Sequence, residues 1–169
     1  LRYDFLAPRR IVFGWGRRAE LGAIACGLGR RAWLVAAPSV AKSPVFAELL
    51  EHLQGAEVEA QLLATSEGEP TIAQVDAAAA RARQLGARRG DLVIGIGGGS
   101  ALDLAKAVAA LAVQRESASV REYLEGVGTG RQLVEQPLPI IALPTTAGTG
   151  TEATKNAVIS VDVPAGKRS

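Results

Sequence analysis

The sequence has few of the residues on which several kinds of site and scaffold depend. Its 169 residues include one cysteine, Cys26, which excludes an intrachain disulfide, and one histidine, His52. A single imidazole cannot make a metal site. Lys and Arg number 19 against 17 Asp and Glu, so composition gives no electrostatic case for binding nucleic acid. No apolar run approaches the roughly 20 residues of a membrane span, and no signal-peptide pattern opens the chain. We therefore expect a cytoplasmic protein that binds neither nucleic acid nor membrane.

Aromatic residues are also scarce, at 4% of the chain against 48% hydrophobic residues in total. The core must be built from Ala, Leu, Val and Ile, which suits helices packed on a parallel sheet. Short apolar segments with strand character alternate with segments of helical spacing that end at glycine. We expect strands at 10–13, 32–37, 58–63, 92–96, 140–143 and 157–161, and helices at 17–28, 44–55, 71–85, 100–113 and, in short form, 119–125. This order predicts a single α/β domain over residues 1–169, with a Rossmann-like, doubly wound, mostly parallel sheet and helices on both faces.

The strand at 92–96 ends in three glycines that lead into a helix. Gly97, Gly98 and Gly99 remove every Cβ from this turn, so another group can approach the backbone closely. We expect Ser100 as the N-cap of the helix and Asp103 in its first turn. Free N–H groups at a helix start attract phosphate, so the turn favours a nucleotide site. The motif is neither a P-loop nor a strict Rossmann fingerprint, and a tight turn without a ligand is an alternative.

A second polar turn follows the strand at 140–143. Residues 144–152 read Pro-Thr-Thr-Ala-Gly-Thr-Gly-Thr-Glu. Hydroxyl groups and bare backbone at a strand end suit phosphate and ribose oxygens, although a solvated turn capped by threonines would have the same composition. Because both turns follow buried strands of one sheet, we expect them to lie at the same edge.

Together the two turns resemble the motifs of a known family. Residues 97–106, Gly-Gly-Gly-Ser-Ala-Leu-Asp-Leu-Ala-Lys, and residues 139–152, which begin Pro-Ile-Ile-Ala-Leu, look like the amino-terminal domain of iron-containing (group III) alcohol dehydrogenases. The opening Ile-Val-Phe-Gly at 11–14 and the helix start at Pro70-Thr71 also fit, so the resemblance covers nearly the whole chain. The wider superfamily includes glycerol dehydrogenase, maleylacetate reductase and dehydroquinate synthase.

The resemblance implies hydride transfer between a small alcohol or aldehyde and NAD(H) or NADP(H). The three glycines and Ser100 would hold the pyrophosphate, and Asp103 would face the nicotinamide side of the cleft. The motifs imply further cofactor contacts from Thr145, Thr146, Thr149, Thr151 and, near the ribose, Lys167. Glu152 and Lys106 also belong to the motifs. We interpret Glu152 as a structural hydrogen-bond partner behind the loop, and a surface cation explains Lys106 equally well.

Cofactor choice depends on the residue after the second strand. In the family, Asp at this point contacts the adenine ribose and favours NAD, whereas a small residue leaves room for a 2′-phosphate. Ala37 stands there in this sequence, so we expect NADP to be tolerated or preferred. Ser39 could donate to the phosphate, although capping a helix or turn is an alternative role.

The metal site of the family is the larger departure. Its Fe²⁺ or Zn²⁺ is bound by one Asp and three His, in a carboxyl-terminal helical domain and the segment before it, and this chain stops short of both. We therefore expect a cofactor-binding half that is inactive alone and has no catalytic or metal-binding residue of its own. A stand-alone nucleotide-binding or interaction module is one alternative, and a metal-free reductase of the superfamily is another. A lone half would expose the apolar face on which a second domain packs, so we also expect homo-oligomers.

Overall fold

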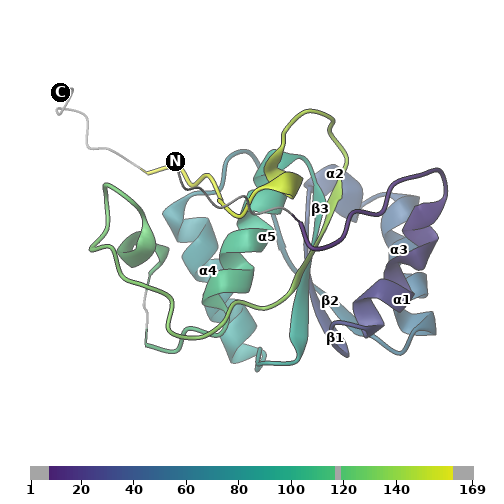
Figure 1. The fold of residues 1–169 in the computed structure, drawn as a ribbon, viewed down its shortest axis with the longest axis horizontal. Helices are drawn as coiled ribbons and strands as arrows, with labels where there is room; N and C mark the ends of the chain where they lie inside the picture. Colours follow the sequence, from purple (N-terminus) through teal and green to yellow (C-terminus); the bar gives the residue numbers. More distant parts are fainter. Residues whose placement is uncertain (1–7, 117–118, 162–169) are drawn as a thin grey trace, which may run out of the picture.

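The computed structural model describes residues 8–116 and 119–161, and a four-stranded parallel sheet lies at its centre (Figure 1). The strands are β1 (Arg31–Ala36), β2 (Glu59–Thr65), β3 (Asp91–Gly97) and β4 (Ile140–Pro144). They lie in the order β2-β1-β3-β4, and each neighbouring pair is parallel. β1 and β3 lie at the centre of the sheet. The strand that follows β1, β2, lies on one side of this pair, and the strand that follows β3, β4, lies on the other. A ligand site in such a sheet is expected at this switch point, outside the carboxyl ends of β1 and β3.

Helices cover both faces of the sheet, as Figure 1 shows. One face carries α1 (Leu21–Cys26) and α3 (Pro44–Gly55), and the other carries α4 (Ile72–Gln84) and α5 (Gly99–Leu111). The short elements are η1 (Arg17–Glu20), α2 (Pro38–Ala41), η2 (Val120–Tyr123) and η3 (Thr151–Ala153). Among the described residues, no helix has the length and apolar character needed to cross a membrane. The predicted Rossmann-like α/β class, the parallel sheet and the helices on both faces are confirmed.

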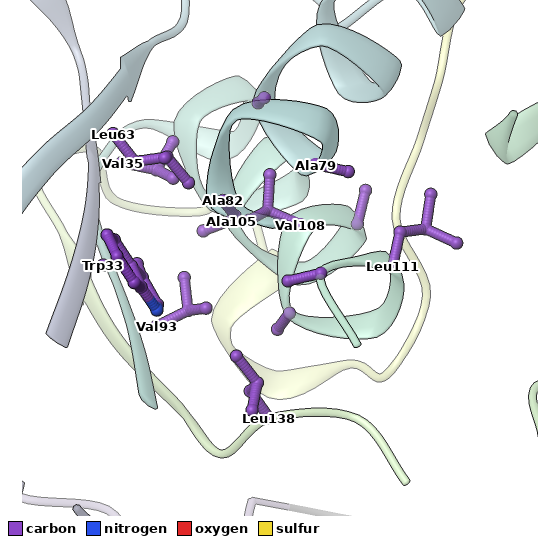
Figure 2. Packing of buried hydrophobic residues seen from close by; sticks show 14 of the residues in the cluster. Trp33, Val35, Leu63, Ala79, Ala82, Val93, Ala105, Val108, Leu111 and Leu138 are labelled. Carbon is purple, nitrogen blue, oxygen red and sulfur yellow. The ribbon is translucent and has the colours of Figure 1, made fainter. Parts of the chain in front are cut away.

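Alternate strand residues supply two hydrophobic cores. Trp33 and Val93 belong to the core beneath α4 and α5, whereas Leu34 and Ile94 belong to the core beneath α1 and α3. Figure 2 shows the first core, in which Trp33 and Val93 lie near Ala105 of α5. Because both faces are covered, β1 and β3 read as nearly continuous apolar segments.

The contact between α5 and β3 is so close that one position requires glycine. A Cβ built on Gly95 would lie 2.7 Å from the Cβ of Ala105 and 3.1 Å from Cδ2 of Leu102. Small residues on the strand and on the helix therefore set how closely α5 lies against the sheet. This packing also fixes where the first turn of α5 stands relative to the carboxyl edge.

A buried carboxylate joins β1 and β3 near the opposite edge. Oδ2 of Asp91 accepts hydrogen bonds from Arg31 Nη2 at 2.6 Å, from Trp33 Nε1 at 3.0 Å and from the Arg88 backbone N–H at 3.1 Å. Asp91 is 4% exposed, so the carboxylate has exchanged water for these donors. Removing one partner of such a buried pair is costly because the other charge stays buried.

Two helix starts follow the sequence signals in different ways. At α4, Thr71 Oγ1 accepts from the Gln74 N–H and Gln74 Oε1 accepts from the Thr71 N–H, which completes a capping box. At α3, Ser43 occupies the predicted N-cap position and Pro44 follows it. The Ser43 hydroxyl, however, donates to the Val40 carbonyl at 2.7 Å instead of capping α3.

Several predicted elements were wrong in extent or type. Residues 10–13 form no strand, and at 157–161 only an isolated bridge between Thr71 and Ser160 is present. Neither segment has a full-length partner strand in the described part of the chain, and a strand needs one to satisfy its backbone. The helix predicted at 17–28 is a 3-10 turn followed by a helix that ends at Cys26. Ser100 is not the N-cap, because α5 begins at Gly99 with Gly98 as its N-cap, two residues before the predicted position.

Candidate nucleotide-binding site

The glycine turn lies at the switch point between β1 and β3. Gly97 ends β3 with φ +152°, a conformation that favours glycine. A Cβ on Gly97 would lie 2.8 Å from the Cβ of Ala101 and 3.0 Å from the Cβ of Ala37. The Ala37 N–H donates to the Ile96 carbonyl at 2.9 Å, which continues the pairing of the two strands into the turn. The fold therefore requires glycine at position 97.

The first turn of α5 presents free donors at this edge. Gly98 is the N-cap of α5 and provides no side-chain cap. In residues 8–116 and 119–161, the backbone N–H groups of Gly99 and Ser100 have no hydrogen-bond partner. Gly98, Gly99 and Ser100 are each only partly buried, so these groups are accessible. Uncapped N–H groups and the positive end of a 13-residue helix make a site for an anion.

The threonine-rich loop at 145–150 lies against this helix start. The Thr145 N–H donates to the Gly97 carbonyl at 2.9 Å, which fixes the start of the loop beside the glycine turn. A Cβ on Gly98 would lie 3.1 Å from Thr146 Oγ1, and one on Gly99 would lie 3.5 Å from the Cβ of Thr149. The three threonines are exposed. The two motifs predicted to meet at one sheet edge therefore do so.

A buried polar cluster lies behind the loop. Thr151 Oγ1 donates a short hydrogen bond to Asp103 Oδ1 and accepts one from Lys106 Nζ at 2.8 Å. Lys106 Nζ also lies 3.5 Å from Asp103 Oδ1. Burial lowers the pKa of the Lys106 ammonium, and attraction to Asp103 and Glu152 opposes that shift without cancelling it. Lys106 is thus a mostly buried partner in the cluster, its side chain 10% exposed, and the solvated surface cation is the less suitable interpretation.

The comparisons with known proteins agree with this geometry. The family model of iron-containing alcohol dehydrogenases matches residues 8–168. The chain belongs to the iron-containing alcohol dehydrogenase family. It is 38% identical over 164 residues to long-chain-alcohol dehydrogenase 1 of Geobacillus thermodenitrificans, covering 93% of this chain and 40% of that protein. It is 35% identical over 162 residues to sulfoacetaldehyde reductase of Bilophila wadsworthia, covering 95% of this chain and 39% of that protein.

Solved structures of the iron-containing alcohol dehydrogenase family share the fold. A crystal structure of an iron-containing alcohol dehydrogenase has a TM-score of 0.77 at 33% identity, over 91% of this chain and 40% of that one. A sulfoacetaldehyde reductase from Bifidobacterium kashiwanohense, solved in complex with NAD⁺, has a TM-score of 0.75 at 34% identity, over 91% and 39%. The chain therefore spans about 40% of the length of these relatives.

The residues present in this family member fit a dinucleotide. The cradle at 97–99 has no Cβ, the α5 start offers free N–H groups, and the Thr146 hydroxyl lies beside Gly98. They do not fit a metal, since the described ranges contain no group of three or more His, Cys, Asp or Glu that could hold one. His52 stands on α3, where its Nε2 lies 3.4 Å from Glu48 Oε1. No chemical step in this chain is assigned to a metal.

Most of the predicted site residues gather at this edge, with different exposures. Ala37, the three glycines, Ser100 and the exposed threonines line it, whereas Asp103 and Thr151 are buried behind it at 7% and 8% exposure. Ser39 is exposed on α2 and is not its N-cap, which is Ala37. Glu152 accepts a hydrogen bond from the Thr149 hydroxyl at 3.1 Å, in line with a structural role. Lys167 lies outside the described residues.

Sequence reasoning missed the partners of Lys106 beyond the two motifs. Its ammonium also donates to Thr154 Oγ1 at 3.2 Å and to the Asn156 carbonyl at 2.7 Å. The available signal was the spacing of Asp103 and Lys106, three positions apart on a helix whose other residues are almost all Ala, Leu and Val. Such a pair on an apolar helix predicts a shared buried environment.

Proposed function

We propose that this chain is the dinucleotide-binding half of an NAD(P)-dependent alcohol dehydrogenase. The observation that carries the proposal is the uncapped start of α5, where two free N–H groups and three Cβ-free residues lie beside the exposed threonine-rich loop, with Thr146 Oγ1 nearest to Gly98. Such donors suit the pyrophosphate, and the hydroxyls suit ribose and phosphate oxygens. In the intact protein, the bound cofactor would supply a nicotinamide ring to accept the hydride from the alcohol carbon, while the alcohol hydroxyl releases a proton. The products are an aldehyde or ketone and the reduced cofactor.

The role of this chain in that reaction is to bind and orient the cofactor. In metal-dependent members, Fe²⁺ or Zn²⁺ polarises the alcohol oxygen. The ligands of that metal would be supplied by the rest of the protein. Asp103 is buried behind the loop, where its Oδ1 contacts Thr151 and Lys106, so we assign it an orienting role. The chain by itself is therefore expected to bind a cofactor without oxidising alcohol.

We further propose that NADP is tolerated or preferred. Ala37 at the end of β1 places no carboxylate where a 2′-phosphate would approach, and Ser39 is exposed on the following turn. Lys42, the C-cap of the same short helix, adds an exposed cation. A carboxylate at this point would repel the phosphate and accept from the ribose hydroxyls of NAD instead.

Titration of the chain with NADH and NADPH, followed by cofactor fluorescence, tests both proposals. Binding of either cofactor supports the nucleotide site, and equal or tighter binding of NADPH supports the assignment of Ala37. Absence of binding by both would overturn the proposed function. A strong preference for NADH would overturn only the cofactor assignment.

Association of copies stays a proposal as well. Ile11, Phe13 and Trp15 are 76%, 91% and 104% exposed, in a segment that makes no strand. Large apolar side chains exposed in this way favour association. Light scattering across a wide concentration range would show oligomers, and a strictly monomeric species throughout would contradict the proposal.

A further inference from the structure

Lys106 uses its whole donor capacity on one segment of the chain. An ammonium group has three N–H donors. Nζ of Lys106 donates to Thr151 Oγ1 at 2.8 Å, to Thr154 Oγ1 at 3.2 Å and to the Asn156 carbonyl at 2.7 Å. Its side chain is 10% exposed, so these contacts replace water almost completely. A lysine on a solvated helix face makes no such set of bonds.

The three acceptors lie directly after the threonine-rich loop. Thr151 begins η3, and its hydroxyl donates a hydrogen bond to the Asp103 carboxylate. Two residues before it, Thr149 lies against Gly99 at the start of α5. The loop is therefore fastened at two points, by the Thr145 N–H on Gly97 and by the Lys106 ammonium on residues 151–156.

We propose that Lys106 is a positioning residue of the dinucleotide site: its ammonium holds residues 151–156 against α5 and so keeps the threonine-rich loop beside the glycine turn. This role rests on the proposed function, since it is a role in binding the cofactor. Lys106 contacts residues 151–156 and not the glycine turn itself, so it affects cofactor binding through the position of the loop.

The charge of Lys106 supports the same role. Two carboxylates face it, Asp103 from α5 and Glu152 from η3. With the ammonium present, the buried Asp103 carboxylate is balanced next to a site that must accept two phosphates. Without it, an unbalanced negative charge stays behind the loop and opposes the anionic ligand.

Three variants test the proposal. Lys106→Met keeps most of the side-chain volume and removes the three donors and the charge. Thr154→Val removes one acceptor and leaves the lysine in place. Lys155→Met is the matched control, because Lys155 is an exposed lysine of the same segment with no hydrogen bond or ion pair in the described structure. The readouts are NADH and NADPH affinity from pH 6 to 10 and amide hydrogen exchange.

Lys106→Met should weaken binding of both cofactors by about tenfold or more, as expected for losing hydrogen bonds to a charged group. Thr154→Val should have a smaller effect, and Lys155→Met should bind as the parent does. Exchange should become faster at 145–156 in Lys106→Met and stay unchanged in β1 and α3, which shows that the fold is retained. Affinity of the parent should fall as alkaline pH removes the Lys106 charge, and Lys106→Met should lack that step.

The outcomes separate this role from the function on which it rests. Equal cofactor affinity and equal exchange in the parent and Lys106→Met would overturn the positioning role alone. A parallel pH profile in both proteins would also overturn it, because a purely structural lysine leaves the profile unchanged. Absence of NADH and NADPH binding by the parent would overturn the proposed function, and this role with it.

Discussion

Replacing Gly98 with aspartate should weaken cofactor binding strongly and leave folding intact. Gly98 has φ −75° and ψ −174°, which any residue can adopt, and it is the N-cap of α5. Aspartate is among the preferred N-cap residues and exceeds glycine there by only a few tenths of a kcal/mol. The new Cβ would lie 3.1 Å from Thr146 Oγ1, so the threonine must move by a few tenths of an ångström. The net effect on unfolding free energy should stay within about 1 kcal/mol.

The effect on binding should be much larger. A carboxylate about 4 Å from a phosphate charge is repelled by about 1 kcal/mol in bulk water and about 4 kcal/mol at an effective dielectric constant of 20. The site is partly buried, so a value between these limits applies. The aspartate carboxylate would also accept hydrogen bonds from the free N–H groups that would otherwise bind the phosphate. Together these effects predict a loss of affinity of about 100-fold, or roughly 2.8 kcal/mol.

Two control variants make this result specific. Gly98→Asn caps the helix in the same way without the charge and should lose less affinity. Gly55→Asp adds the same carboxylate at the end of α3, where nothing lies within 4 Å of the new Cβ, and should bind normally. Thermal unfolding and titration with NADH and NADPH are the assays. A Gly98→Asp protein that binds as the parent does would refute the placement of the pyrophosphate, and one that fails to fold would refute the separation of binding from folding.

Three further predictions concern cofactor preference at Ala37, the ion pair of Asp91 and the charge of Lys106. Ala37→Asp should shift preference toward NADH over NADPH by about tenfold, roughly 1.4 kcal/mol, and an unchanged ratio in paired titrations would contradict the cofactor assignment. Asp91→Asn should lower the free energy of unfolding in urea by about 2 kcal/mol, because the partly buried Arg31 loses its charged partner. A change near zero would show that the pair is dispensable. The pKa of Lys106 is lower in the folded chain than in the unfolded chain, so the unfolded chain holds this proton more tightly. The free energy of unfolding of the parent, relative to that of Lys106→Met, should therefore rise with pH between the lowered pKa and about 10.5. Urea titrations of both proteins across this range measure the difference, and a difference that falls with pH would contradict the burial of the ammonium.

The sequence predicts this fold well where local patterns and burial agree. β1 and β3 are covered on both faces, so their apolar character was enough to place them to within a residue or two. The segment at 10–13 has the same composition and forms no strand, because strand formation depends on a neighbour that composition does not reveal. Likewise, Ser100 is a better N-cap residue than Gly98, yet the N-cap is Gly98, two residues earlier, where Gly97 packs closely against Ala37 and Ala101.

The candidate site was predictable in position and only partly in its connections. The motifs indicated which residues meet, since strand ends of a parallel sheet share an edge. They did not indicate that Lys106 fastens the loop, because its acceptors at 154 and 156 lie 48 and 50 residues away and beyond the motif. Long-range side-chain contacts of this kind depend on the tertiary path of the chain.

The most direct test of the central claim is to record backbone amide NMR spectra of the chain while NADPH is added. A dinucleotide held at the start of α5 should shift the amide signals of Gly98, Gly99 and Ser100 and those of the threonine-rich loop at 145–150, and should leave the β1–β3 connection around Asp91 unchanged. Shifts confined to any other part of the chain, or no shifts at saturating NADPH and NADH, would contradict the assignment of this edge as the cofactor site.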